Sequence, residues 1–163
     1  MRLFAIAALA LIAASSAPWV LGDIGLSQGG HVVKFGVPRA AAIAAVSAVS
    51  GKPIKAHSIP DCGQGEPMSR VEFRNGLGME FLRGKFSGWT LDGNGDRSFK
   101  TSKGVGIGAT LATLKKAYPS VTVDDGSLGV MFTVENGPSG FLDNTKPTAH
   151  VTSLYSGETC MIS

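Results

Sequence analysis

Apolar and polar residues alternate over much of the chain beyond residue 30, and two stretches follow a helical period instead. Alternation with period two is typical of strands that bury one face, whereas apolar residues at i, i+3 and i+4 indicate a helix. The first helical stretch begins near Pro38 and ends by Gly51 and Pro53. Its predicted buried side consists of Ala42, Ile43, Val46 and Val49.

The second helical stretch carries clear signals at both ends. Thr110 can cap its first turn, and Pro119 stops it. Leu111, Leu114 and Tyr118 recur at helical spacing and form its predicted buried stripe. The pattern therefore predicts a short amphipathic helix between Thr110 and Pro119.

The alternating segments are separated by turn signals such as Asn-Gly. In the first half of the chain they cover residues 69–74, 77–82, 86–91 and 98–101. In the second half they cover residues 121–124, 128–134 and 150–155, with a short piece at 141–142. Together with the two helices, these strands predict an α+β domain with helices packed on one face of a sheet.

The chain also resembles itself. At an offset of 72 residues, positions 35–40 align with 107–112, and at an offset of 61, positions 71–76 align with 132–137. Both matches occur in the same order, a helix followed by an Asn-Gly hairpin, which indicates tandem duplication. We therefore predict two repeats, about 31–101 and 103–160. Each is a helix followed by an antiparallel meander, and the two repeats form one sheet.

This arrangement resembles the architecture of the β-lactamase-inhibitor-protein family and its relatives, the small outer-membrane assembly lipoproteins of the SmpA/OmlA kind. The residues that carry the resemblance are 108–119, their copy at 36–46, and the ending 154–160. The resemblance implies a non-enzymatic protein-binding scaffold. The chain departs from the lipoproteins in having no cysteine to lipidate after its first apolar run, and from the inhibitors in having only two cysteines, enough for one disulfide.

The first 22 residues have the three parts of a signal peptide. Arg2 precedes an apolar run at residues 3–14, which is shorter than the roughly 20 residues that span a membrane. Cleavage after Ala17 would leave Pro18 first, which disfavours that site, so we expect cleavage after Gly22. Residues 1–22 are then the signal peptide and residues 23–163 a single periplasmic or secreted domain with no stable membrane anchor. The alternative is an uncleaved N-terminal anchor.

Cys62 and Cys160 are the only cysteines. In an oxidising compartment the default for such a pair is a structural disulfide. A zinc site would need ligands from His31, His57 and His150, but their spacing is irregular and no close ligand pair exists. We therefore predict a Cys62–Cys160 disulfide and no metal.

Other motifs fall short of the chemistry that they suggest. Residues 92–96 begin like a calcium loop, but Arg97 replaces the required glycine and Lys103 the bidentate glutamate. The glycines at 104–108 fit neither the dinucleotide nor the phosphate-loop spacing. A net charge of +3 without a basic cluster gives no sign of nucleic-acid binding. We therefore expect no cofactor, no catalytic residues and no nucleic-acid partner.

The hairpin at Asn75-Gly76 provides the predicted binding surface. A loop of residues 75–77 would pair Phe73 with Met79, and Val71 with Phe81, keeping apolar side chains on one face. The other face would carry charges, with Glu72 opposite Glu80, and one of the two strand-borne aromatics at its edge. The predicted partner-binding residues are Arg70, Glu72, Arg74, Glu80 and Trp89; the second strand-borne aromatic is Tyr155.

The sequence thus favours an exported, non-catalytic protein-binding domain, inhibitor-like or an envelope scaffold, whose partner is an envelope or secreted protein. Two alternatives stay open. One is a structural envelope protein without a dedicated partner, for which the charged face is only a solvated surface. The other is a periplasmic hydrolase, which would show a pocket with convergent titratable groups.

Overall fold

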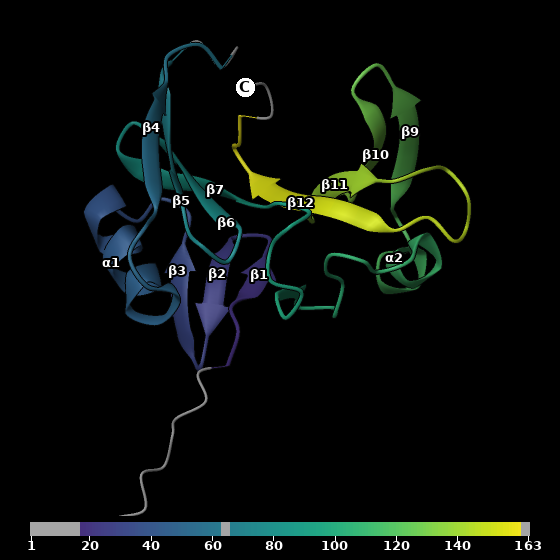
Figure 1. Cartoon of the computed structure of the whole chain (residues 1–163), viewed down its shortest axis with the longest axis horizontal. Coiled ribbons are helices and arrows are strands. Elements are labelled where there is room, and N and C mark those ends of the chain that lie inside the picture. Colours follow the sequence, from purple (N-terminus) through teal and green to yellow (C-terminus); the bar gives the residue numbers. More distant parts are fainter. Residues whose placement is uncertain (1–16, 63–65, 161–163) are drawn as a thin grey trace, which may run out of the picture.

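Two β-sheets and two α-helices make up residues 17–62 and 66–160, the part of the chain described by this computed structural model (Figure 1). The smaller sheet has the strand order β3-β2-β1-β8, and the larger has the order β4-β5-β6-β7-β12-β11-β10-β9. Strands β1 and β8 are parallel, and the other neighbouring strands are antiparallel. The predicted α+β class is confirmed, but two sheets replace the predicted single sheet. Neither helix of this described part is long and apolar enough to cross a membrane.

The elements have the following bounds. The smaller sheet consists of β1 (Val20–Gly22), β2 (Gly25–Gln28), β3 (His31–Lys34) and β8 (Lys100–Thr101). The first half of the larger sheet consists of β4 (Lys55–Ile59), β5 (Met68–Glu72), β6 (Leu77–Leu82) and β7 (Lys85–Leu91). Its second half consists of β9 (Thr122–Gly126), β10 (Gly129–Thr133), β11 (Ser139–Leu142) and β12 (Val151–Gly157). The helices are α1 (Arg39–Ser50) and α2 (Leu111–Ala117).

Both helices lie where the periodicity predicts them. The Thr110 side chain accepts a hydrogen bond from the backbone N–H of Thr113 and caps α2, whose predicted apolar stripe is buried. In α1, Ala42 and Val46 are fully buried, but Val49 is 39% exposed and its predicted burial is wrong. The fully buried residues of α1 are thus spaced by four, and Ile43 packs against the core beside them while being only partly buried.

The β5–β6 hairpin forms with a different register from the predicted one. Val71 lies opposite Met79 and Glu72 opposite Gly78, so the loop consists of residues 74–76. The Gly76 N–H donates to the Phe73 carbonyl at 3.0 Å, and Gly76 has a φ of 81°. This left-handed residue closes the loop one position earlier than expected, as glycine does in three-residue hairpins. Apolar residues still share one face, because the shift preserves the alternation.

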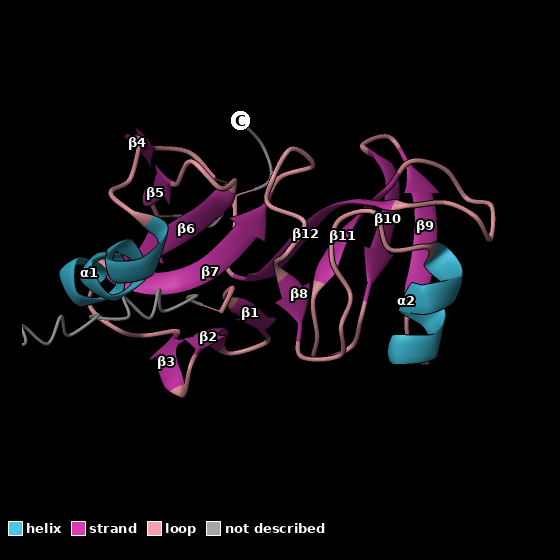
Figure 2. Cartoon of the chain, turned by 60° about the horizontal axis from the view of Figure 1, so that its bottom comes forward, coloured by secondary structure: helices cyan, strands magenta, loops and turns pink. Residues whose placement is uncertain are grey.

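One continuous core contains residues of both sheets and both helices. The smaller sheet and the helices lie on the same side of the larger sheet (Figures 1 and 2). The largest side chains in this core are those of Phe73, Phe81, Phe86, Trp89 and Phe132. The opposite side of the larger sheet is called the outer face below, and it faces upward in Figure 1.

Strand β1 lies inside the fold although its residues were predicted to be removed with the signal peptide. Trp19 is 3% exposed and Leu21 is fully buried, with Leu26 on one side of it and Thr101 on the other. The carbonyl of Gly22 accepts a hydrogen bond from the Trp89 indole at 2.8 Å. Cleavage after Gly22 would take a central strand out of the smaller sheet, so the expected mature start moves upstream of Trp19. Residues 1–16 lie outside the described part.

Candidate functional site

The first half of the outer face contains a row of polar side chains from adjacent strands. His57 of β4 lies opposite Arg70 of β5, which lies opposite Glu80 of β6. These three residues, called the polar row, point away from the core because Val71 and Met79 occupy the alternate positions. The predicted charged face is therefore present, but its members are arranged differently.

Arg70 and Glu80 form an ion pair that is shielded from solvent. Arg70 Nε donates to Glu80 Oε1 at 2.7 Å, and Arg70 Nη2 donates to Thr90 Oγ1 at 3.1 Å. The Glu80 side chain is fully buried, and its Oε2 has no hydrogen-bond partner among the described residues. Burial raises the pKa of Glu80 above its ordinary value, while the charge of Arg70 acts in the opposite direction. Nδ1 of His57 is also buried without a partner among the residues described.

The C-terminal segment covers part of this row and is held there by a disulfide. Cys62 is bonded to Cys160, with their Cα atoms 5.6 Å apart, as the sequence predicts. Cys160 is buried against Ile59 and Met68 on the outer face. At Gly88 there is no room for a side chain, because an added Cβ would lie 2.6 Å from the carbonyl oxygen of Glu158. The disulfide indicates an oxidising, non-cytoplasmic compartment.

The structure does not bring the five predicted binding residues together on one exposed surface. Trp89 is fully buried in the core on the other side of the sheet, and Glu80 is buried in its ion pair, so neither offers an exposed contact. Glu72 lies opposite Gly78 and not Glu80, and its carboxylate is 3.8 Å from Lys55 Nζ. Arg74 is exposed at the hairpin turn. Sequence alternation identified β5, β6 and β7 but not β4, and it could not show which side the smaller sheet covers.

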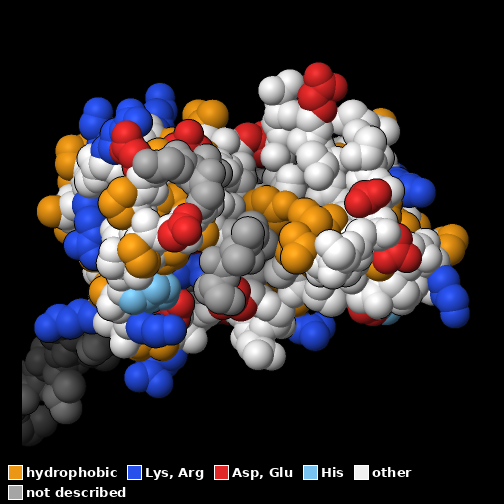
Figure 3. All heavy atoms as spheres, turned by 90° about the horizontal axis from the view of Figure 1, so that it is seen from above, with side chains coloured by type: hydrophobic (Ala, Val, Ile, Leu, Met, Phe, Trp, Pro, Cys, Tyr) orange, Lys and Arg blue, Asp and Glu red, His pale blue; other side chains and the backbone are white. Residues whose placement is uncertain are grey.

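The second half of the outer face is apolar where the first is charged. Met131 of β10 lies opposite Phe141 of β11, and the ring centroids of Phe141 and Tyr155 are 6.5 Å apart. These three half-buried residues are called the aromatic patch. Partial burial also raises the pKa of Tyr155. Hydrophobic side chains gather in the middle of the molecule when it is seen from above (Figure 3).

The sequence offered a partial signal for this patch. Tyr155 stood out as a strand-borne aromatic residue, but Met131 and Phe141 did not. In residues 128–134 one alternating set is apolar throughout, and Met131 is the single large apolar side chain of the other set. Phe132 and Val134 of this stretch are buried in the core, so Met131 must face outward.

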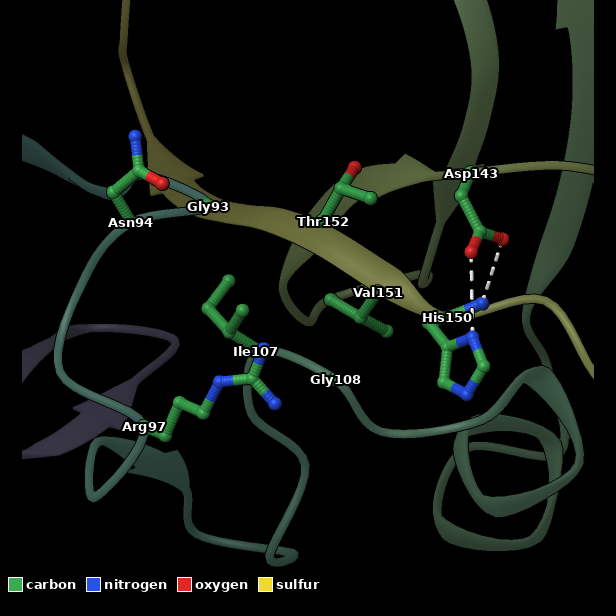
Figure 4. A pocket seen from close by; sticks show the side chains of 9 residues that line it. All are labelled: Gly93, Asn94, Arg97, Ile107, Gly108, Asp143, His150, Val151 and Thr152. Carbon is green, nitrogen blue, oxygen red and sulfur yellow. Dashed lines mark hydrogen bonds and ion pairs between the residues drawn. The ribbon is translucent and has the colours of Figure 1, made fainter.

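A cleft of about 580 Å³ lies at the first residues of β12, the end of that strand away from the C-terminal segment, and is called the polar cleft (Figure 4). Its lining residues are Gly93, Asn94, Arg97, Ile107, Gly108, Asp143, His150, Val151 and Thr152. The backbone N–H of His150 donates to Asp143 Oδ1 at 2.8 Å, and His150 Nδ1 lies 3.3 Å from Asp143 Oδ2. The hydrogen bonds to His150 lower the pKa of Asp143. Arg97 reaches into the cleft from the loop after β7.

The remaining sequence motifs act as turns. Residues 92–96 form a tight loop in which Gly95 N–H donates to the Asp92 carbonyl at 2.7 Å. The N–H of Gly108 donates to the Val151 carbonyl, so it is not free to bind a phosphate. The described residues contain no group of three or more His, Cys, Asp or Glu side chains that could hold a metal ion.

Comparison with protein-family models, with curated proteins and with solved structures found no match for this chain. The function therefore has to be argued from the outer face and the clefts alone.

Proposed function

We propose that this protein is an exported, non-catalytic binding domain that contacts a periplasmic or secreted protein through its outer face. The observation that carries the proposal is the aromatic patch, in which Met131, Phe141 and Tyr155 adjoin one another on a sheet face away from the core. Aromatic residues and methionine are enriched in protein interfaces, where a few of them supply most of the binding energy. The disulfide supports the oxidising, non-cytoplasmic compartment that this proposal requires.

The two ends of the outer face differ in a way that suits recognition. The first half carries the buried ion pair and the disulfide-held segment, while the second half carries the aromatic patch. Asp124 lies opposite Met131 in the register and adds a negative charge at the border of the patch. An apolar centre with a polar rim is the usual anatomy of a protein contact surface.

We also propose that the fold arose by duplication of a helix and a four-stranded meander, as in the inhibitor-like architecture that the sequence resembles. The element order supports this: α1 precedes β4, β5, β6 and β7, and α2 precedes β9, β10, β11 and β12. Helices α1 and α2 begin at an offset of 72, and β5 and β10 have equal bounds at an offset of 61.

Backbone hydrogen bonds repeat in the same way. Gly36 N–H donates to the Phe86 carbonyl at 2.7 Å, and Gly108 N–H donates to the Val151 carbonyl at 2.8 Å. Each glycine directly follows an aligned apolar residue, Phe35 or Ile107, and has a positive φ, 90° and 80° respectively. Two connections into a helix with the same bonds and the same left-handed glycine support a common origin.

Variant-dependent capture tests the binding proposal. A tagged protein starting at residue 17 is incubated with an envelope extract of its own source, alongside a Phe141→Ala/Tyr155→Ala variant. We expect wild type to retain a defined partner and the variant to lose most of it. Ile24→Ala is the matched control, because Ile24 is 63% exposed but lies outside the larger sheet.

The outcomes separate the alternatives. Equal capture by wild type and the double variant, with both folded by circular dichroism, would contradict the assignment of the patch. A wild-type protein that retains nothing under conditions that preserve envelope complexes would instead favour a purely structural role.

A further inference from the structure

The molecule has two clefts at corresponding places in the two halves of its fold. Each lies where an apolar residue and a left-handed glycine precede a helix. The polar cleft adjoins Ile107 and Gly108, and a second cleft of about 480 Å³ adjoins Phe35 and Gly36. This second one, called the apolar cleft, is lined by Phe35, Gly36, Leu82, Arg83, Lys85, Phe86, Ser87, Gly157 and Glu158.

The side chains that line the two clefts have diverged in chemistry. The residue before α1, Pro38, forms a β-bridge with Lys85, and the residue before α2, Thr110, forms one with His150. Lys85 therefore corresponds to His150, and Phe86 corresponds to Val151. Phe35 of the apolar cleft corresponds to Ile107 of the polar cleft at the offset of 72. The smaller isoleucine side chain leaves more space in the polar cleft than the phenylalanine ring leaves in the apolar cleft. The floor of the apolar cleft is closed by the contact of Phe35 with Phe86, whose ring centroids are 5.1 Å apart. The polar cleft has no such ring pair.

The charge at the mouth also differs. In the apolar cleft the segment after β12 contributes Glu158, whereas in the polar cleft the segment after β7 contributes Arg97. No acidic side chain in the described parts of the chain pairs with Arg97. Asp143, the carboxylate in the same cleft, is occupied by two contacts from His150. The polar cleft therefore presents, at one end, a guanidinium without an acidic partner among the described residues and, at the other end, a carboxylate that already accepts a hydrogen bond from His150.

Gly108 leaves room for the guanidinium in this position. A Cβ added there would lie 3.0 Å from Arg97 Nη1, which is too close for an unstrained contact. The Arg97 side chain extends along the cleft toward Ile107 and Gly108, and the His150 ring stands at the other end (Figure 4). Ile107 and Val151 form an apolar floor between these two groups.

We propose that the polar cleft binds a small organic carboxylate, independently of the protein contact made by the outer face. The planar guanidinium of Arg97 matches a carboxylate with two parallel hydrogen bonds. The apolar part of the ligand lies on Ile107 and Val151. A cleft of this volume suits a small molecule, since ligand pockets typically have about 300–1,000 Å³.

Butyrate is a suitable probe, because it combines one carboxylate with a short apolar chain. Amide chemical shifts of the ¹⁵N-labelled protein are followed during titration with sodium butyrate, and with butyramide at matched ionic strength as the neutral control. We expect saturable shifts at Gly93, Gly108 and Thr152 with butyrate and none with butyramide. Arg97→Gln should weaken binding about tenfold or more, the loss expected for a charge-assisted hydrogen bond.

Arg83→Gln is the matched control variant, because Arg83 is an exposed arginine at the apolar cleft whose partner is Glu66. It should bind butyrate like wild type. Arg97 is exposed, so its replacement leaves the fold intact, which the unchanged spectrum outside the cleft verifies. Equal shifts with butyramide, unaltered affinity in Arg97→Gln, or the absence of any saturable shift would overturn the proposal.

Discussion

Glu80 is a carboxylate in an environment that only partly satisfies it. One oxygen accepts from Arg70, and the other has no hydrogen-bond partner among the described residues. Removing such a group from water costs free energy that a single partner does not return in full. The neighbouring charges add to the effect, because Glu72 and Asp92 both raise the pKa of Glu80. Glu80 is therefore more easily protonated in the folded protein than in the unfolded chain.

This difference predicts how stability depends on pH. Because the pKa of Glu80 is raised in the folded state, its contribution to the free energy of unfolding falls as the pH rises from its ordinary value of 4.5 through the folded pKa. Glu80→Gln cannot ionise and should lack this decline. Urea unfolding of wild type and variant across this range measures the difference.

Two other carboxyls provide a check on the sign. The pKa values of Asp96 and Asp143 are lowered by hydrogen bonds, so these groups lose their stabilising effect as the pH falls. That change lies below their ordinary value of 3.8 and is shared by wild type and variant. If the stability difference between wild type and Glu80→Gln stays constant above pH 4.5, the interpretation of Glu80 is wrong.

At the scale of elements, β1 restricts where the predicted signal peptide can be cleaved. Its flanking residue Trp19 and its central residue Leu21 are buried in the core, and each buried apolar side chain of this size contributes about 1.5–3 kcal/mol. The small residues Ala14 and Ser16 offer a cleavage site before Ala17. We expect intact-mass measurement of the exported protein to give a start at Ala17.

Purified chains test the same point without export. A protein starting at Asp23 should unfold at a markedly lower urea concentration than one starting at Ala17, because it lacks β1 and the Gly22 carbonyl that accepts from Trp89. Equal stability of the two chains would show that β1 is dispensable and would restore cleavage after Gly22.

Elements with strong local signals were predictable, and those defined by distant partners were not. The cap at Thr110 and the stop at Pro119 determine α2 from within a few residues. Residues 20–28 instead form strands because Leu21 and Leu26 meet the core and β8. In isolation the apolar stretch at 19–21 is indistinguishable from the end of a signal peptide. The hairpin register depended on where one glycine adopts a positive φ, which periodicity does not encode.

The candidate sites show the same limit. The charged positions of β5 and β6 follow from alternation, but the burial of Glu80 and Trp89 depends on the C-terminal segment and the smaller sheet. The aromatic patch joins β10, β11 and β12, and the polar cleft adds Arg97 from the loop after β7. Such groupings require the strand order of the whole sheet, which no local pattern supplies.

At the scale of the whole molecule, the two halves of the larger sheet meet only at β7 and β12. The disulfide adds a covalent link between the first half and the end of β12, across 98 residues. For a loop of this length the chain-entropy estimate is about 4–5 kcal/mol. Cys62→Ser/Cys160→Ser should therefore have a free energy of unfolding, measured by urea denaturation, that is lower by up to this amount.

Hydrogen exchange locates the effect. The Glu158 N–H donates to the Ser87 carbonyl at 2.9 Å, and we expect its protection to fall in the cysteine-free variant while that of α2 is retained. Wild type treated with reductant should match the variant. Unchanged protection at Glu158 in both cases would show that packing alone holds the C-terminal segment in place.

The same bridge constrains how the protein matures. When the polypeptide is synthesised from the N-terminus onward, Cys62 becomes available for oxidation well before Cys160, because 98 positions separate them. With no third cysteine in the sequence, any disulfide that Cys62 forms in that interval is with a foreign thiol. Exchange with Cys160 must then displace that thiol. If Cys62 is oxidised before Cys160 is available, we therefore expect a mixed disulfide, from which native protein forms only by thiol exchange.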